Sequence, residues 1–573
     1  MDEQKNIRVK RNKSAFVLKL SVFIRSHEFL CLCVLCIFIS FLRFLYCGFE
    51  YAFTLDDYIQ YHNYASATDY WKLIIQEGLF ASRPLAVIAD LFIYAPLFDH
   101  MIIGVLLNSI LFGLSGMLFY ASFSRLFGTG KLFIFFYLLL PLNFEATYWL
   151  SASSRIVSGL FYTSLSLYLF IVFIKTKRTT TAVAACVLQL ISISFYEQIF
   201  ILSLALWLMT ALIFLLKKIK TSYLGLISVV NAAVYFAFTR AFAGGGAISA
   251  RMELCLPTSS YYFKTFFPDI SRQIGAAFIK GGIRTLFTGF IRGIKLIVTE
   301  NGWLYLLICV AMSLLIYYFC RISRKFRKAS VSGKESRPHV NFTAAVYGFL
   351  AMLAPVTPFL IIANPWFSLR STAASIVGAA VLIDLLFRML IRNKRRTFAA
   401  VCAAFSLVSL IAAASETYDY MKTYELDKIV LRETEKAVKS GAASGKTGIL
   451  NLNSSLLDEQ NFLYHEHVTG VFSSEWAFYG AMVYTNGGEL SYPVVPLPTN
   501  GYSYYHGWDK NFKILSQYDS VLYWDNLNMS LNPLVKEKIG EEDYMLYTQD
   551  GKIYAHVFEE DGYGYINFAE NSD

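Results

Sequence analysis

The chain has 573 residues, of which 56% are apolar, 16% are charged and 17% are aromatic, and its formal net charge is +10. Soluble proteins have roughly 25% charged residues, so this composition argues against a soluble fold around one core. The clustered lysines and arginines lie between apolar runs, where they orient membrane helices, and the positive charge therefore does not indicate nucleic-acid binding.

The N-terminal segment, residues 1–28, is basic and is expected to lie in the cytoplasm. No small-residue cleavage site follows the first apolar run, Phe29–Cys47, so this run is predicted to be a retained membrane helix. Arg43 near its outer end is expected to snorkel to the headgroups. The later candidate spans approach the ~20 residues that a bilayer requires. They are Met101–Tyr120, Leu132–Trp149, Ile156–Phe173, Ala182–Phe195, Ile199–Leu216, Tyr223–Phe238, Trp303–Cys320, Phe342–Ile362, Thr372–Leu390 and Phe398–Ala414.

These spans, about eleven in all, place the two termini on opposite sides of the membrane. With the N-terminus in the cytoplasm, every compact basic cluster falls in an inner loop, as the positive-inside rule requires. The membrane domain then covers residues 29–415, and its long outer loops are residues 48–100 and 243–302. Residues 416–573 are expected to lie outside the cytoplasm.

The C-terminal region begins with a charged helical stretch, Glu416–Lys439. Strand-like runs follow at Thr447–Leu452, Ser520–Trp524 and Lys552–Phe558, separated by Gly, Asn and Pro turns. The expected fold class is an all-α polytopic membrane bundle with a small extracytoplasmic α/β domain.

Polar residues cluster where several spans are expected to meet the outer face. Such groups are costly in a membrane and are therefore functional candidates, although each can also serve as a helix cap, a headgroup anchor or an ion-pair partner. They are Asp56, Asp57, Arg83, Glu145, Arg155, Tyr196, Glu197 and Arg370. By contrast, Asp384 and Arg388 are spaced i, i+4 near the inner end of the tenth span and are predicted to form a structural pair.

These residue types suit the transfer of a sugar from a phosphate leaving group. The reaction needs a base for the acceptor hydroxyl and carboxylates near the oxocarbenium-like charge, which the four acids offer. It also needs Arg forks or a hard divalent cation on the departing phosphate. The sequence has no Walker A pattern and no inner loop large enough for a nucleotide-sugar domain. A lipid-phosphate donor is therefore expected.

Three motifs of the chain together carry a family resemblance. They are the acidic pair Asp56-Asp57 after the first span, Arg83-Pro84-Leu85, and Glu145 before Tyr148-Trp149-Leu150. In these motifs the chain resembles the GT-C superfamily of polyprenyl-phosphate-sugar-dependent glycosyltransferases. Among bacterial members the chain looks like those that modify surface polysaccharides, including the GtrII-like glucosyltransferases. The resemblance covers roughly residues 29–200 in motifs and the later helices only in hydropathy.

The resemblance implies a catalytic base or metal-associated group at Asp56 or Asp57, and the motif does not say which. Our hypothesis takes Asp56 as the base and Asp57 as the ligand of a Mg or Mn ion or as a hydrogen-bond partner. The remaining candidates, Arg83, Glu145, Arg155, Tyr196, Glu197 and Arg370, are assigned to substrate binding. The implied donor is a polyprenyl-phosphate sugar, and the acceptor is a surface glycan, teichoic acid or glycolipid outside the plasma or inner membrane.

Three other classes of protein stay open. A flippase or transporter of lipid-linked glycans is expected to place charges along the whole bundle and to show inverted repeats, neither of which is evident. A polysaccharide polymerase or ligase uses similar substrates and differs by elongating chains. A non-catalytic assembly or sensor protein is expected to work through the outer domain.

Overall fold

The structure is a computed structural model that describes residues 26–62, 83–242, 254–322, 337–363, 366–391, 394–452, 470–497, 515–541, 543–560 and 563–569. The chain divides into two compact units. The helical unit comprises Met1–Phe49, Trp71–Ala89 and Ile102–Thr417, and the sheet unit comprises Glu50–Tyr70, Asp90–Met101 and Tyr418–Asp573. Two pieces of the expected first outer loop thus belong to the sheet unit.

Most of the chain is helical, and its helices are those of a multi-pass membrane protein. Among the described residues, eight helices are long and apolar enough to cross a membrane, and all but Tyr262–Thr299 lie on expected spans. These are α5 to α6 (Pro84–Phe127), α9 (Leu150–Thr176), α11 (Glu197–Leu216), η6 with α12 (Lys220–Ala241), η7 to α15 (Tyr262–Thr299), α16 (Trp303–Ile322), α17 with η9 (Val340–Leu360) and α19 (Arg395–Ser440).

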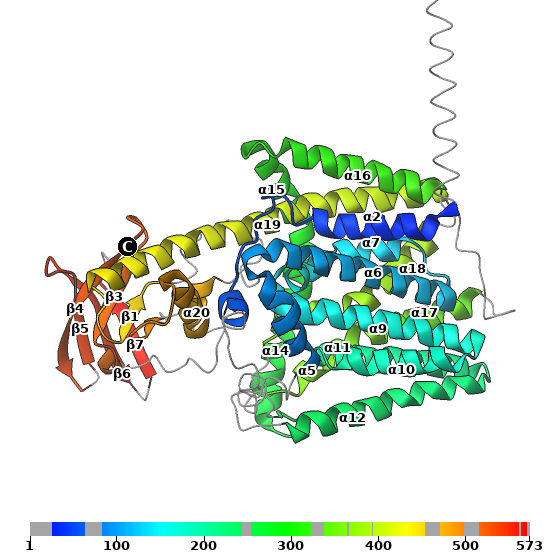
Figure 1. Ribbon diagram of the computed structural model, residues 1–573, viewed down its shortest axis with the longest axis horizontal. Helices are drawn as coiled ribbons and strands as arrows, with labels where there is room; N and C mark the ends of the chain where they lie inside the picture. The colour runs from blue at the N-terminus through cyan, green and yellow to red at the C-terminus, as the bar shows by residue number, and fades with distance from the viewer. Residues whose placement is uncertain are drawn as a thin grey trace, which may run out of the picture. The chain divides into compact units, whose positions relative to one another are not determined.

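The exact count of eleven spans is not confirmed. Four expected spans coincide with shorter helices, namely α2 (Glu28–Leu42), α7 (Leu132–Leu139), α10 (Thr179–Ile193) and α18 (Ile376–Ile391). Helices α9 to α12 run side by side in the bundle (Figure 1). The backbones of α17 and α18 approach closely at two glycines, because a Cβ on Gly378 would lie 2.2 Å from the carbonyl oxygen of Gly348.

The third expected span, Leu132–Trp149, is not one continuous helix. Helix α7 ends at Leu139, and Pro141 opens a 3₁₀ turn, η5 (Pro141–Asn143), before the short helix α8 (Glu145–Tyr148). Proline has no N–H to donate to the carbonyl four residues earlier. The side-chain amide of Asn143 donates to the Tyr137 carbonyl instead, at 2.6 Å.

Arg43 also satisfies a backbone carbonyl at this break, and the expectation that it snorkels to the headgroups is wrong. The residue is only 2% exposed. Its Nη1 donates to the Leu138 carbonyl at 2.8 Å and to the Asn143 side chain, and its Nη2 donates to the Thr147 hydroxyl. Membrane helices tolerate breaks where side chains satisfy the freed backbone groups, and Arg43 serves that purpose here.

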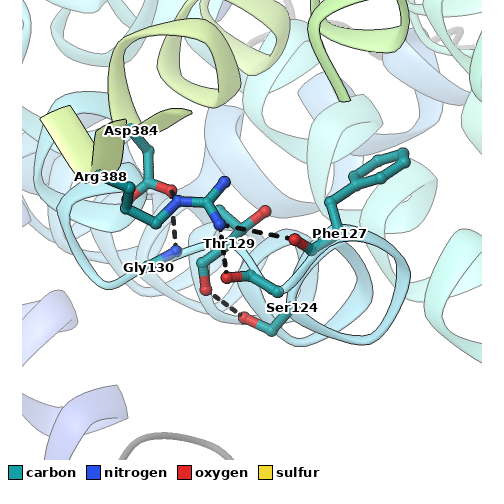
Figure 2. A network of polar contacts seen from close by, with 7 residues as sticks. Ser124, Phe127, Thr129, Gly130, Asp384 and Arg388 are labelled. Atoms are coloured by element: carbon teal, nitrogen blue, oxygen red, sulfur yellow. Dashed lines mark hydrogen bonds and ion pairs between the residues drawn. The ribbon is translucent and has the colours of Figure 1, made fainter. Parts of the chain in front are cut away.

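Asp384 and Arg388 form the predicted pair on α18, with Arg388 Nε 2.8 Å from Asp384 Oδ2. Figure 2 shows that the pair also holds the turn between α6 and α7. The Gly130 N–H donates to Asp384 Oδ2 at 2.8 Å, and Arg388 Nη1 donates to the Gly128 carbonyl at 2.8 Å. The two charges therefore pair with each other and with backbone groups of this turn, which fits the structural interpretation.

The sheet unit contains a seven-stranded sheet in the order β2-β1-β3-β4-β5-β6-β7. Strand β1 is parallel to β2 and β3, and all later neighbours are antiparallel. The three predicted strands fall on β1, β3 and β6. The strands are β1 (Thr447–Leu450), β2 (Val494–Pro496), β3 (Ser520–Asp525), β4 (Ser530–Gly540), β5 (Asp543–Tyr547), β6 (Ile553–Glu560) and β7 (Tyr563–Phe568).

Two helices accompany the sheet. Helix α20 (Glu475–Asn486) lies between β1 and β2 in the chain and begins at Ser474, whose side chain accepts the Ala477 N–H at 3.3 Å. The predicted helical stretch Glu416–Lys439 is helical, but it is not a separate element. It continues the last expected span without a break, so both form the single helix α19.

Candidate functional site

The helical unit holds a polar group around Arg83, the residue before α5 (Pro84–Ala89). Arg83 Nε lies 2.9 Å and 3.2 Å from the two carboxylate oxygens of Glu197, the first residue of α11. Its guanidinium carbon lies 4.4 Å from the centre of the Tyr196 ring. The Leu85 N–H donates to the Ser194 carbonyl at 3.3 Å, which fixes the start of α5 against the turn between α10 and α11.

A second pairing joins α8 to the 3₁₀ turn η10 (Leu369–Thr372). Glu145 is buried, and its carboxylate accepts the backbone N–H of Arg370 at 3.0 Å and the Ser368 hydroxyl at 3.4 Å. The Thr372 hydroxyl donates to the Leu142 carbonyl at 2.6 Å. Glu145 therefore determines the position of Arg370 through the backbone.

The guanidinium of Arg370 contacts two indole rings. Its central carbon lies 4.6 Å from the Trp149 ring centre and 4.4 Å from that of Trp366. Both distances are in the range of cation–π contacts. Such contacts engage the faces of the guanidinium, whereas its N–H donors lie in its plane and point outward from its edge. Among the described residues, Arg370 makes no side-chain hydrogen bond that would occupy these donors.

These two groups are neighbours at one end of the bundle. The side-chain amide of Gln198, next to Glu197, donates to the Ser371 carbonyl at 2.9 Å. Arg155, on the first turns of α9, lies close enough to Arg83 for the two charges to repel. The six residues assigned to substrate binding therefore lie together, and we call Arg83, Glu145, Arg155, Tyr196, Glu197 and Arg370, with Trp149 and Trp366, the arginine cluster.

The predicted catalytic pair belongs to the sheet unit, and its two members differ in their surroundings. Asp57 is completely buried. It accepts the Tyr51 hydroxyl at 2.6 Å and the Thr54 N–H at 3.0 Å. Its carboxylate thus binds the N–H three residues earlier, in the turn that precedes η1 (Tyr58–His62). These contacts fit a structural role.

Asp56 is partly exposed, and the hydrogen bond that it accepts is longer than those of Asp57. The indole N–H of Trp476, on α20, donates to Asp56 Oδ1 at 3.2 Å. The preceding residue, Leu55, is buried and has a φ of +41°, in the left-handed region that L side chains rarely adopt. Backbone strain of this kind concentrates at functional sites. Trp476 is 420 residues away in the chain, and no sequence pattern pointed to it.

The expected divalent cation stays a prediction. Among the residues that the structure describes, no group of three or more His, Cys, Asp or Glu side chains is placed to hold a metal ion. Asp57, the tentative ligand, accepts hydrogen bonds from a hydroxyl and a backbone N–H in its buried position.

Asp427 is a buried acid of the sheet unit that the sequence did not single out. It lies on the part of α19 that follows the apolar segment, and it accepts the Val471 N–H at 3.0 Å. Burial raises its pKa to about 8, and the hydrogen bond from Val471 opposes the shift only in part. No hydrogen bond reaches its Oδ1 from the described residues.

This raised pKa predicts a pH-dependent stability. The unfolded-state pKa of aspartate is about 3.9, so the folded protein binds the proton more tightly. The contribution of protonated Asp427 to the stability of the folded protein is therefore complete below about pH 4 and is lost as the pH rises towards 8. We expect Asp427→Asn to raise the thermal unfolding midpoint of the detergent-solubilised chain at pH 9, but not at pH 4. A difference between variant and wild type that stays constant from pH 4 to 9 would contradict the assignment.

The chain matches no known family model and no curated protein. The function of the arginine cluster and of Asp56 must therefore be inferred from their chemistry.

Proposed function

We propose that the protein is a membrane glycosyltransferase of the GT-C type. It transfers a monosaccharide from a polyprenyl-phosphate carrier to a surface glycan, teichoic acid or glycolipid, at the outer face of the plasma or inner membrane. The observation that carries the proposal is the position of Arg370, whose guanidinium contacts two tryptophan rings and whose backbone is bound by the buried Glu145.

This arrangement suits recognition of a lipid-borne phosphate. A guanidinium binds phosphate oxygens through its planar fork of N–H donors. The two indoles restrict the orientation of Arg370, so that less side-chain freedom is lost when a ligand binds. The cluster lies at an end of the membrane bundle, where the phosphate of a lipid carrier would be found. Arg155 adds positive charge nearby, whereas the charge of Arg83 is paired with Glu197.

In the proposed reaction, Asp56 accepts the proton of the acceptor hydroxyl. The acceptor oxygen then forms a bond to the anomeric carbon of the sugar. The bond between that carbon and the phosphate oxygen breaks, and polyprenyl phosphate leaves with the bonding electron pair. The arginines stabilise the negative charge that develops on the phosphate. Asp56 is the better candidate for the base because Asp57 is buried and already accepts two hydrogen bonds.

Arg370→Ala tests the phosphate role. Purified protein is reconstituted into proteoliposomes with radiolabelled polyprenyl-phosphate monosaccharides, one sugar at a time, and membranes from cells that lack the chain supply acceptors. We expect the variant to raise the KM for the donor at least about tenfold, because a charge-assisted hydrogen bond contributes about 1.5–3 kcal/mol. The matched control is Arg272→Ala, which removes an exposed arginine paired with Asp269.

An Arg370→Ala variant that folds normally and keeps the wild-type donor KM would remove the phosphate assignment. Absence of transfer from every lipid-linked sugar by the wild-type protein would remove the proposed activity itself. The length of the product separates the closest alternative, because a polymerase adds repeated units whereas the proposed enzyme adds one sugar.

A further inference from the structure

The helix Tyr262–Thr299 is long and apolar enough to cross a membrane, but its contacts are not those of a spanning helix. It consists of η7 (Tyr262–Phe266), α14 (Phe267–Gly275), η8 (Ala276–Arg284) and α15 (Thr285–Thr299), and we call it the crossing helix. A spanning helix contacts its neighbours along their length. The crossing helix instead contacts several helices one after another.

Three contacts define its path. The Tyr262 hydroxyl donates to the Leu360 carbonyl at the end of η9, at 3.0 Å. Farther along, Gly282 packs on Leu142 in η5, and Gly293 packs on the Ile411 backbone of α19. Roughly 30 residues separate the first contact from the last, which is about 45 Å of helix and more than the ~30 Å of a hydrocarbon core.

Helices α14 and α15 are seen at one end of the helical unit (Figure 1). The Thr372 hydroxyl, on the same 3₁₀ turn as Arg370, donates to the Leu142 carbonyl. The Phe367 N–H donates to the side-chain oxygen of Gln273 of α14 at 3.0 Å. The crossing helix therefore lies across the end of the bundle.

The second half of the helix has one face fixed to the bundle. This face carries small residues at four-residue spacing, Thr285, Gly289 and Gly293, all of them buried. A Cβ on Gly293 would lie 2.1 Å from the Ile411 carbonyl oxygen, and a Cβ on Gly282 would lie 2.6 Å from a Leu142 methyl group. Small residues of this kind let helices pack closely in membrane proteins.

A second face is apolar and exposed. It is formed at helical spacing by side chains that are 43% to 70% exposed. They are Ile283, Phe287, Ile291, Ile294 and Val298. A continuous apolar stripe on a helix marks a surface that is covered by another apolar phase.

A third face is basic. Lys280, Arg284 and Lys295 are exposed, and Arg284 and Lys295 each follow a member of the apolar stripe in the chain. The whole crossing helix has a single acidic residue, Asp269, which pairs with Arg272 at 2.7 Å. The charge of this face is therefore complementary to an anionic surface.

We propose that the crossing helix lies in the membrane interface and binds anionic phospholipid headgroups. Its apolar stripe enters the acyl chains beside the bundle, and Lys280, Arg284 and Lys295 contact the lipid phosphates. An interfacial helix has this division into an apolar and a basic face, and basic residues near an anionic surface strengthen its binding. This inference does not depend on the proposed sugar transfer.

The lipid preference is tested by native mass spectrometry of the full-length protein in detergent, titrated with phosphatidylglycerol or phosphatidylcholine. We expect the double variant Arg284→Gln, Lys295→Gln to bind phosphatidylglycerol roughly tenfold more weakly and phosphatidylcholine unchanged. The control, Lys436→Gln, Lys439→Gln, removes two exposed lysines of α19 and should bind both lipids like the wild type. Equal phosphatidylglycerol affinity in the Arg284/Lys295 variant and the wild type overturns the proposal.

The depth of the helix is tested separately in proteoliposomes with brominated lipids. The fluorescence that Phe287→Trp adds to that of the wild type should be quenched most by bromines near the headgroup end of the lipid acyl chains. Ile291→Trp replaces this variant if it misfolds. Leu527→Trp, in an exposed turn of the sheet unit, serves as the control that lipid should not quench. Strongest quenching by bromines at the bilayer centre indicates a spanning helix, and no quenching indicates a helix outside the membrane. Either result overturns the proposal.

Discussion

Replacing Asp56 with asparagine is expected to lower the rate of sugar transfer by about 10²–10⁴-fold, the usual contribution of a general base. Asparagine has nearly the same shape and can still accept the hydrogen bond from the Trp476 indole. It cannot take the proton of the acceptor hydroxyl. The fold and the thermal unfolding midpoint should therefore stay at the wild-type values, and the loss should appear in kcat.

Asp57→Asn is the matched comparison and should behave in the opposite way. Asp57 is buried and accepts hydrogen bonds from the Tyr51 hydroxyl and the Thr54 N–H. Its replacement removes the charge from two buried hydrogen bonds, and charge-assisted bonds contribute about 1.5–3 kcal/mol each whereas neutral ones contribute about 0.5–1.5 kcal/mol. We expect a lower unfolding midpoint and near-normal kcat per folded molecule. If Asp57→Asn instead removes activity without loss of stability, the roles of the two residues are exchanged.

Replacing Arg43 with methionine is expected to destabilise the helical unit by about 3 kcal/mol or more, the range for removing one partner of a buried polar network. Methionine fills a similar volume but has no donor for the Leu138 carbonyl, the Asn143 side chain or the Thr147 hydroxyl. The thermal midpoint in detergent, measured at one scan rate, should fall by several degrees.

Arg43→Lys keeps the charge but not the two-sided fork of donors, and we expect it to recover only part of the stability. The control Arg272→Met removes an exposed arginine, 63% exposed at its side chain, and should leave the midpoint nearly unchanged. A wild-type midpoint for Arg43→Met would show that the break after α7 does not need this residue.

Local patterns in the sequence were enough to predict most elements of this protein. Runs of apolar residues predict membrane helices because each run must meet the hydrocarbon core on its own. The i, i+4 spacing likewise predicted the pair Asp384 and Arg388, since residues four apart are neighbours on one face of a helix. The strands β1, β3 and β6 followed from short apolar runs bounded by turn residues.

The candidate site was predictable only in part. The residues of the arginine cluster were chosen because they were expected at the same face, and Glu145 does meet the backbone of Arg370, 225 residues away. The partners that give them their properties were not predictable. Neither the contact of Trp476 with Asp56 nor the burial of Asp427 against Val471 has a local signal, because each joins segments far apart in the chain.

The sequence alone therefore determined most of the apolar segments, three of the seven described strands, and the residue types that are available for chemistry. The tertiary structure decided what surrounds them. Arg43 is buried because Pro141 frees carbonyls that need donors, and the crossing helix lies across the bundle because Gly282 and Gly293 allow close contact with Leu142 and Ile411. Hydropathy depends on one residue at a time, whereas burial and pairing depend on neighbours that only the folded chain brings together.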